Sequence, residues 1–92
     1  MKKHYNILLT GRVQRVGFRF YAMQAAYRYH INGTIKNKDI DKVYIEAEGA
    51  EEDIVAFVQW CKRGSPGSVV HDVQINEGEL TNYESFDVIR GN

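Results

Sequence analysis

The chain has a single cysteine, Cys61, and a single proline, Pro66, among its 92 residues. One cysteine cannot form a disulfide within the chain, so nothing in the composition indicates an oxidising compartment. No run of residues is long and apolar enough to span a membrane, and the start, Met1 to His4, has no signal-peptide pattern. We therefore expect a cytoplasmic protein that has no membrane partner.

The residue patterns of several common catalytic sites are also missing. The three histidines (His4, His30 and His71) are scattered along the chain and give no metal-ligand spacing. The glycine-lysine-serine/threonine signature of nucleotide-binding loops is absent, and no arginine follows Cys61 at the spacing of a cysteine-phosphatase loop. These absences predict a reaction that uses no metal, no cofactor and no cysteine nucleophile.

Alternating apolar and polar residues predict strands, and apolar residues at helical spacing predict helices. We expect these elements to form one domain over residues 1–92. The predicted strands are 5–13, 34–37, 43–49, 70–75 and 86–90, and the predicted helices are 19–31 and 51–63. The order β-α-β-β-α-β with a short extra C-terminal strand is typical of the α+β, ferredoxin-like two-layer sandwich. We expect an antiparallel sheet with both helices on one face.

The segment between the first strand and the first helix carries the main functional signal. Gly11 and Gly17 bracket it, and glycine allows a backbone to bend sharply and to approach a ligand closely. The N–H groups at a helix start are unpaired and lie at the positive end of the helix dipole, where phosphate binds readily. Arg19 adds a planar fork that can hold two phosphate oxygens. The segment therefore predicts an anion site, although a tight turn that merely needs glycine would look similar.

Asn37 is a second candidate because it lies two residues after Ile35 and so shares its face of a strand. A primary amide both donates and accepts hydrogen bonds, so beside a phosphate loop it could position a water molecule. Capping of the following turn is the alternative use of an asparagine here.

The charges are unevenly distributed along the chain. Residues 1–46 carry nine lysines and arginines against three acids, a net +6, whereas residues 47–92 carry three against nine, a net −6. A positive field in the first half would attract a small anion, unless folding mixes the two sets of charges. No nucleic-acid reading surface is evident, so we expect no nucleic-acid partner.

The run from Gly11 to Arg19, GRVQRVGFR, resembles the G-x-V-Q-G-V-x-F-R signature of acylphosphatases. Residues 33–37 resemble their second signature, and residues 64–67 resemble a later loop, so the resemblance covers nearly the whole chain. It implies that Arg19 binds phosphate, that Asn37 orients the attacking water, and that backbone N–H groups cradle the phosphate. Those groups belong to Gln14, Arg15, Val16, Gly17 and Phe18.

The resemblance implies an enzyme that hydrolyses small acyl phosphates to a carboxylate and inorganic phosphate without a metal. We expect a monomer, because no heptad pattern and no large apolar surface patch is visible in the sequence. Arg15 departs from the pattern, since it stands where the family usually has glycine. A non-catalytic, anion-binding module is therefore the alternative, and a domain of a larger enzyme of carbamoyl phosphate chemistry is a further one.

Overall fold

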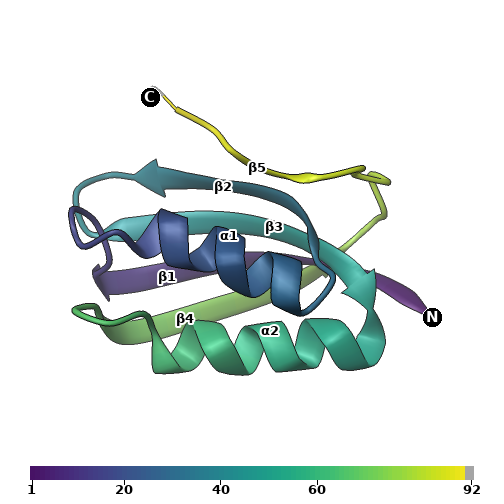
Figure 1. The fold of residues 1–92 in the computed structure, drawn as a ribbon, viewed down its shortest axis with the longest axis horizontal. Helices are drawn as coiled ribbons and strands as arrows, with labels where there is room; N and C mark the ends of the chain where they lie inside the picture. Colours follow the sequence, from purple (N-terminus) through teal and green to yellow (C-terminus); the bar gives the residue numbers. More distant parts are fainter. Residues whose placement is uncertain (91–92) are drawn as a thin grey trace.

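A computed structural model describes residues 1–90, while residues 91 and 92 of the predicted domain lie outside the described part. The strands are β1 (Lys2–Arg12), β2 (Asn32–Lys38), β3 (Lys42–Ala50), β4 (Val69–Gly78) and β5 (Phe86–Val88), and the helices are α1 (Phe18–Arg28) and α2 (Glu51–Arg63). Figure 1 shows both helices on the same face of the sheet. The predicted fold class is therefore confirmed.

The sheet has the order β4-β1-β3-β2-β5. The first four of these strands pair antiparallel, but β5 runs parallel to β2, with Gly33 beside Phe86. The prediction of an antiparallel sheet is thus corrected at one edge, and the sheet is mixed. The physical reason is the connection 79–85, which crosses from the β4 edge to the β2 edge and delivers β5 in the direction of β2.

Helix α2 has the predicted bounds. Three acidic residues occupy its first turn and two basic residues its last turn, which suits the helix dipole. Its buried side chains include Ile54, Phe57, Val58 and Cys61, which form an apolar stripe at helical spacing. In residues 1–90, neither helix is long and apolar enough to cross a membrane.

Helix α1 ends three residues earlier than predicted. Its end is a Schellman motif: the N–H of His30 donates to the carbonyl of Tyr27, and the N–H of Ile31 donates to that of Ala26. His30 takes the left-handed conformation (φ 60°) that glycine usually fills. Asn32 and Gly33, which directly follow the predicted helix 19–31, are the first residues of β2.

A buried polar cluster lies on the sheet face opposite the helices. The Glu48 side chain, in a residue only 1% exposed, accepts hydrogen bonds from the backbone N–H groups of Thr81, Asn82 and Tyr83. Nδ1 of His4 lies 2.7 Å from Oε2 of Glu48. The cluster fixes the connection 79–85 to the centre of the sheet, and so holds the strand that follows it.

Candidate active site

The loop between β1 and α1 takes the backbone shape of an anion-binding nest. Arg15 (φ 62°) and Gly17 (φ 76°) are both left-handed, and they are separated by Val16 alone. Left-handed residues at such spacing can turn successive N–H groups toward a common centre. Among residues 1–90, no backbone or side-chain acceptor bonds to the N–H groups of residues 14–18. These five donors are therefore available to a ligand.

The Gln14 side chain fastens this loop to the turn between β2 and β3. Its Nε2 lies 3.2, 2.9 and 2.8 Å from the carbonyl oxygens of Lys38, Asp39 and Lys42. The N–H of Gly11 donates to the carbonyl of Asp41 at 2.9 Å and ties the same two segments together. Figure 1 shows the loop and the turn together at the left end of the sheet.

This anchoring role of Gln14 was missed by the sequence reasoning, which assigned it only a backbone N–H group. A side-chain amide with two donors, in a loop where the backbone is bent away from regular pairing, was the available signal. The partners could not be foreseen, because they lie 24 to 28 residues away along the chain.

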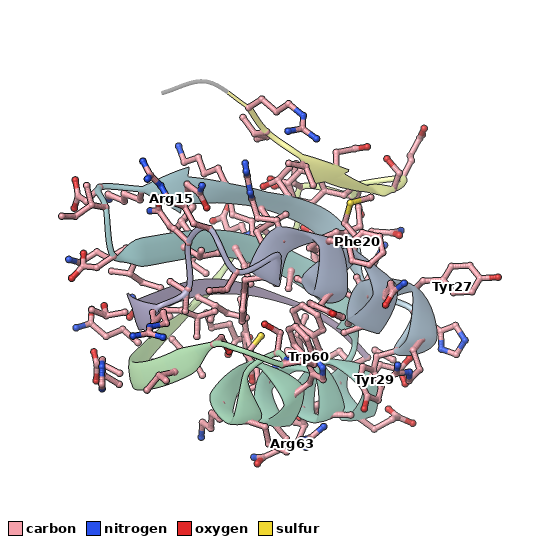
Figure 2. The ribbon with its side chains drawn as sticks, turned by 60° about the vertical axis from the view of Figure 1, so that its left-hand side comes forward. Arg15, Phe20, Tyr27, Tyr29, Trp60 and Arg63 are labelled. Atoms are coloured by element: carbon pink, nitrogen blue, oxygen red, sulfur yellow. The ribbon has the colours of Figure 1, made fainter. Side chains whose placement is uncertain are left out.

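Arg19 lies in the first turn of α1, directly after Phe18. Phe18 is buried, and its ring packs 5.4 Å, centroid to centroid, from that of Trp60 on α2. Figure 2 shows Trp60 between the two helices. This packing fixes the start of α1 and with it the backbone of Arg19. The Arg19 side chain is half-buried and forms no ion pair within residues 1–90, so its guanidinium is free to bind an anion.

Asn37 lies near the end of β2, one residue before the carbonyl to which Gln14 is anchored. Its Oδ1 is buried and has no hydrogen-bond partner among residues 1–90. A buried polar atom without a partner costs about 1–3 kcal/mol, and native proteins rarely leave one unsatisfied. An acceptor in this state is suited to hold a water molecule beside the loop.

The remaining predicted loop residues have different surroundings. Val16 packs against the hydrophobic core, whereas the side chain of Arg15 is exposed. Because an L-residue in the left-handed region costs about 1–2 kcal/mol, the Arg15 backbone is strained where the family pattern has glycine.

Two other features bear on the chemistry. Within residues 1–90 no three side chains among His, Cys, Asp and Glu gather to hold a metal ion, and metal independence stays a prediction. Cys61 is buried in the core, and burial strongly raises the pKa of its thiol. A thiol held neutral is a poor nucleophile.

A hollow of about 730 Å³ lies at the opposite end of α1, where Met23, Ile31 and Phe86 contribute apolar lining. None of the predicted site residues lines it. The predicted site residues thus lie outside this hollow.

Comparison with known proteins gives consistent results. The Acylphosphatase family model matches residues 5–88. An acylphosphatase of Bacillus licheniformis is 39% identical over 85 residues, which cover 91% of this chain and 94% of the relative. The crystal structure of acylphosphatase from Bacillus subtilis has a TM-score of 0.92 at 37% identity, covering 98% of this chain and 100% of that one.

A part of full-length HypF, solved in its phosphate- and nucleotide-bound form, also matches. The TM-score is 0.90 at 34% identity, over 98% of this chain but only 12% of that chain. The family model and the relatives each cover most of this chain. The chain therefore belongs to the acylphosphatase family.

Proposed function

We propose that this protein hydrolyses small acyl phosphates to a carboxylate and inorganic phosphate, with Arg19 and Asn37 as its catalytic residues. Membership of the acylphosphatase family supports the activity. The observation that carries the residue roles is the pairing of two features at one end of the sheet. A nest of free N–H groups with an unpaired arginine lies next to a strand end that holds an unsatisfied buried amide oxygen.

In the proposed mechanism the nest and Arg19 hold the phosphoryl oxygens, and their positive charge stabilises the charge that redistributes in the transition state. Asn37 accepts a hydrogen bond from a water molecule through Oδ1 and orients it for in-line attack. The bond from the water oxygen to phosphorus forms as the bond from phosphorus to the acyl oxygen breaks. The carboxylate leaves with the electron pair, and the water's proton passes to the phosphate.

A carboxylate is a stable leaving group that departs without a strong general acid. Positioning and electrostatic stabilisation are therefore sufficient for this reaction, and each can supply a large part of a rate enhancement. This explains why a site built from backbone donors, one guanidinium and one amide needs no thiolate and no paired carboxylates.

The test is hydrolysis of benzoyl phosphate by the purified protein in the presence of EDTA, with p-nitrophenyl phosphate as the control substrate. We expect turnover of the acyl phosphate and none of the phosphate monoester, because the monoester's leaving group is more basic. Binding of inorganic phosphate without turnover of benzoyl phosphate would instead identify a non-catalytic anion-binding module.

We further propose that residues 1–92 form one domain that acts as a monomer in the cytoplasm. The single cysteine, which is buried and unpaired, supports a reducing compartment. Sedimentation of the purified protein at the mass of one 10.6 kDa chain would support the monomer, and a sedimenting dimer would contradict it.

A further inference from the structure

We propose that Arg15 is a specificity-determining residue that selects acyl phosphates whose acyl group carries a second negative charge. The proposal rests on the proposed function, since it concerns the part of the substrate that leaves. It adds no chemical step: the bond to phosphorus forms and breaks as described above. It assigns a task to a side chain that the mechanism has left without one.

The first support is the state of the Arg15 side chain. It starts from a strained left-handed residue at the middle of the nest, where the loop would be relaxed with glycine. Yet the side chain is exposed and forms no ion pair or hydrogen bond within residues 1–90. Figure 2 shows it at the rim of the molecule beside the end of β2, extending away from the ribbon. Nothing in the described fold compensates for its strain, which points to a partner outside the chain.

The second support is the charge around the nest. Of the nine lysines and arginines in residues 1–46, only Lys3 and Lys42 form ion pairs with acids among residues 1–90. Three of the unpaired cations, Arg12, Arg15 and Arg19, belong to the nest or to the residues that flank it. The ammonium groups of Lys36 and Lys38 lie instead over the Tyr44 ring, at 5.8 and 6.0 Å from its centroid. Folding therefore leaves three arginines without acidic partners, among residues 1–90, at or beside the nest.

The nearby acids do not cancel this excess. Asp39 and Asp41, in the β2–β3 turn, each lie within 4 Å of the Lys42 ammonium group, at 3.9 and 3.1 Å. Asp72 lies opposite Thr10 on β4 and is exposed. Four cations at this end of the sheet, namely Arg12, Arg15, Arg19 and Lys42, thus stand against these three carboxylates.

The positions of these charges determine what they can bind. The transferred phosphate carries about two negative charges. In the proposed mechanism the N–H groups of the nest and the Arg19 guanidinium bind the oxygens that carry these charges. The acyl group must project out of the nest toward solvent, because the phosphate oxygens occupy the N–H groups. Arg15 is the cation on the nest itself whose side chain also lies in solvent. A carboxylate on the acyl group would form an ion pair with the Arg15 guanidinium, whereas an uncharged acyl group would form none.

The experiment compares two substrates that share the reacting group, benzoyl phosphate and 4-carboxybenzoyl phosphate. The quantity measured is the ratio of kcat/KM for the carboxylated substrate to kcat/KM for benzoyl phosphate. We expect Arg15→Gln, which keeps the strained backbone and much of the side-chain length, to lower this ratio about tenfold. Arg15→Gly should lower it to the same extent, and Arg15→Lys should largely restore it.

Two controls make the result specific. Arg63→Gln removes a cation at the end of α2 and should leave the ratio unchanged. Raising the salt concentration from about 0.1 M to about 1 M shortens the screening length from about 10 Å to about 3 Å, and should lower the wild-type ratio toward that of Arg15→Gln. Unfolding midpoints of all variants identify any loss that comes from misfolding.

Three outcomes would overturn the specificity role of Arg15. An equal fall in kcat/KM for both substrates in Arg15→Gln would mean that Arg15 binds the transferred phosphate, and an unchanged ratio would mean that it selects nothing; either overturns the proposal while the proposed function stands. Failure of the wild type to hydrolyse either substrate would overturn the proposed function and this proposal with it.

Discussion

The two glycines that bracket the site loop are required for different physical reasons. A Cβ atom added to Gly11 (φ +145°) would collide with the carbonyl oxygen of Val69 on the neighbouring strand β4. A Cβ atom added to Gly17 (φ +76°) would have its nearest neighbour 3.6 Å away, in the Tyr21 ring. Gly11 therefore allows two strands to approach closely, whereas Gly17 supplies only the left-handed conformation that begins α1.

This difference predicts unequal costs for the same substitution. Gly11→Ala should lower the free energy of unfolding by at least about 3 kcal/mol, because backbone must move. Gly17→Ala should lower it by about 1–2 kcal/mol, the cost of a left-handed L-residue. Urea denaturation of both variants measures these values. Similar losses for the two variants would contradict the distinction.

At the scale of elements, the proposed active site depends on the contact between the β1–α1 loop and the β2–β3 turn. The loop carries the N–H groups and the turn follows the strand that carries Asn37. The Gln14 amide is the main side-chain link between them. It thus holds the loop that we propose binds phosphate in register with the strand end that we propose positions the water.

Gln14→Ala should therefore impair the site more than the fold. We expect the inhibition constant of inorganic phosphate to rise about tenfold, because the nest loses its support, and the free energy of unfolding to fall by only about 1 kcal/mol. Inhibition kinetics and urea denaturation measure the two effects. Gln24→Ala, an exposed site on α1, is the matched control. A loss of stability without weaker phosphate inhibition would show that Gln14 does not support the nest.

The His4–Glu48 cluster holds the connection 79–85 that leads into β5, and it makes this attachment pH-dependent. Burial alone would lower the pKa of His4, but hydrogen bonds with Glu48 and Asn6 and the nearby Glu46 raise it above 6.5 overall. Both ring nitrogens face oxygen acceptors, at 2.7 and 2.9 Å, which suits the doubly protonated ring. Burial would raise the pKa of Glu48, but hydrogen bonds from His4, Thr81 and Tyr83 lower it below 4.5 overall.

The sign of each shift determines when the cluster stabilises the fold. The raised pKa of His4 contributes stability that is complete below pH 6.5 and lost as the pH rises through its folded pKa. The lowered pKa of Glu48 contributes stability that is present above pH 4.5 and lost as the pH falls through its folded pKa. The free energy of unfolding of the wild type should thus exceed that of His4→Gln most between pH 4.5 and pH 6.5. This difference should shrink toward pH 9. Urea denaturation across this range tests it, and a difference independent of pH would contradict it.

At the scale of the whole molecule, local signals in the sequence were sufficient for most of the fold. Helix α2 was predicted with its observed bounds because acids at its start, bases at its end and an apolar stripe agree. Helix α1 was predicted too long because His30, an unusual residue for the left-handed position, ends it before the Asn32-Gly33 pair. The parallel pairing of β5 depends on where the connection 79–85 crosses the sheet, which no local pattern records.

The candidate site likewise has features that the sequence predicted and features that it did not. The nest and Arg19 could be located from consecutive residues, because a strand, a glycine-bracketed turn and a helix start are local features. The Gln14 anchor could not, since it joins residues 24 to 28 positions apart. The same holds outside the site for the His4–Glu48 pair, whose members are 44 positions apart. The mixing of charges left open by the sequence is also answered only by the fold, which within residues 1–90 gives Lys42 acidic partners but leaves Arg12, Arg15 and Arg19 without them.

The central claim is a division of labour in which Arg19 holds the phosphate and Asn37 holds the water. The most direct test measures kcat for benzoyl phosphate and the inhibition constant of inorganic phosphate, in EDTA, for the wild type, Arg19→Ala and Asn37→Ala. We predict that Arg19→Ala loses at least about a thousandfold in kcat/KM and that its phosphate inhibition is strongly weakened. Asn37→Ala should lose about a hundredfold or more in kcat while phosphate inhibits it as it does the wild type. Full activity in Asn37→Ala, or unchanged phosphate inhibition in Arg19→Ala, would contradict the account.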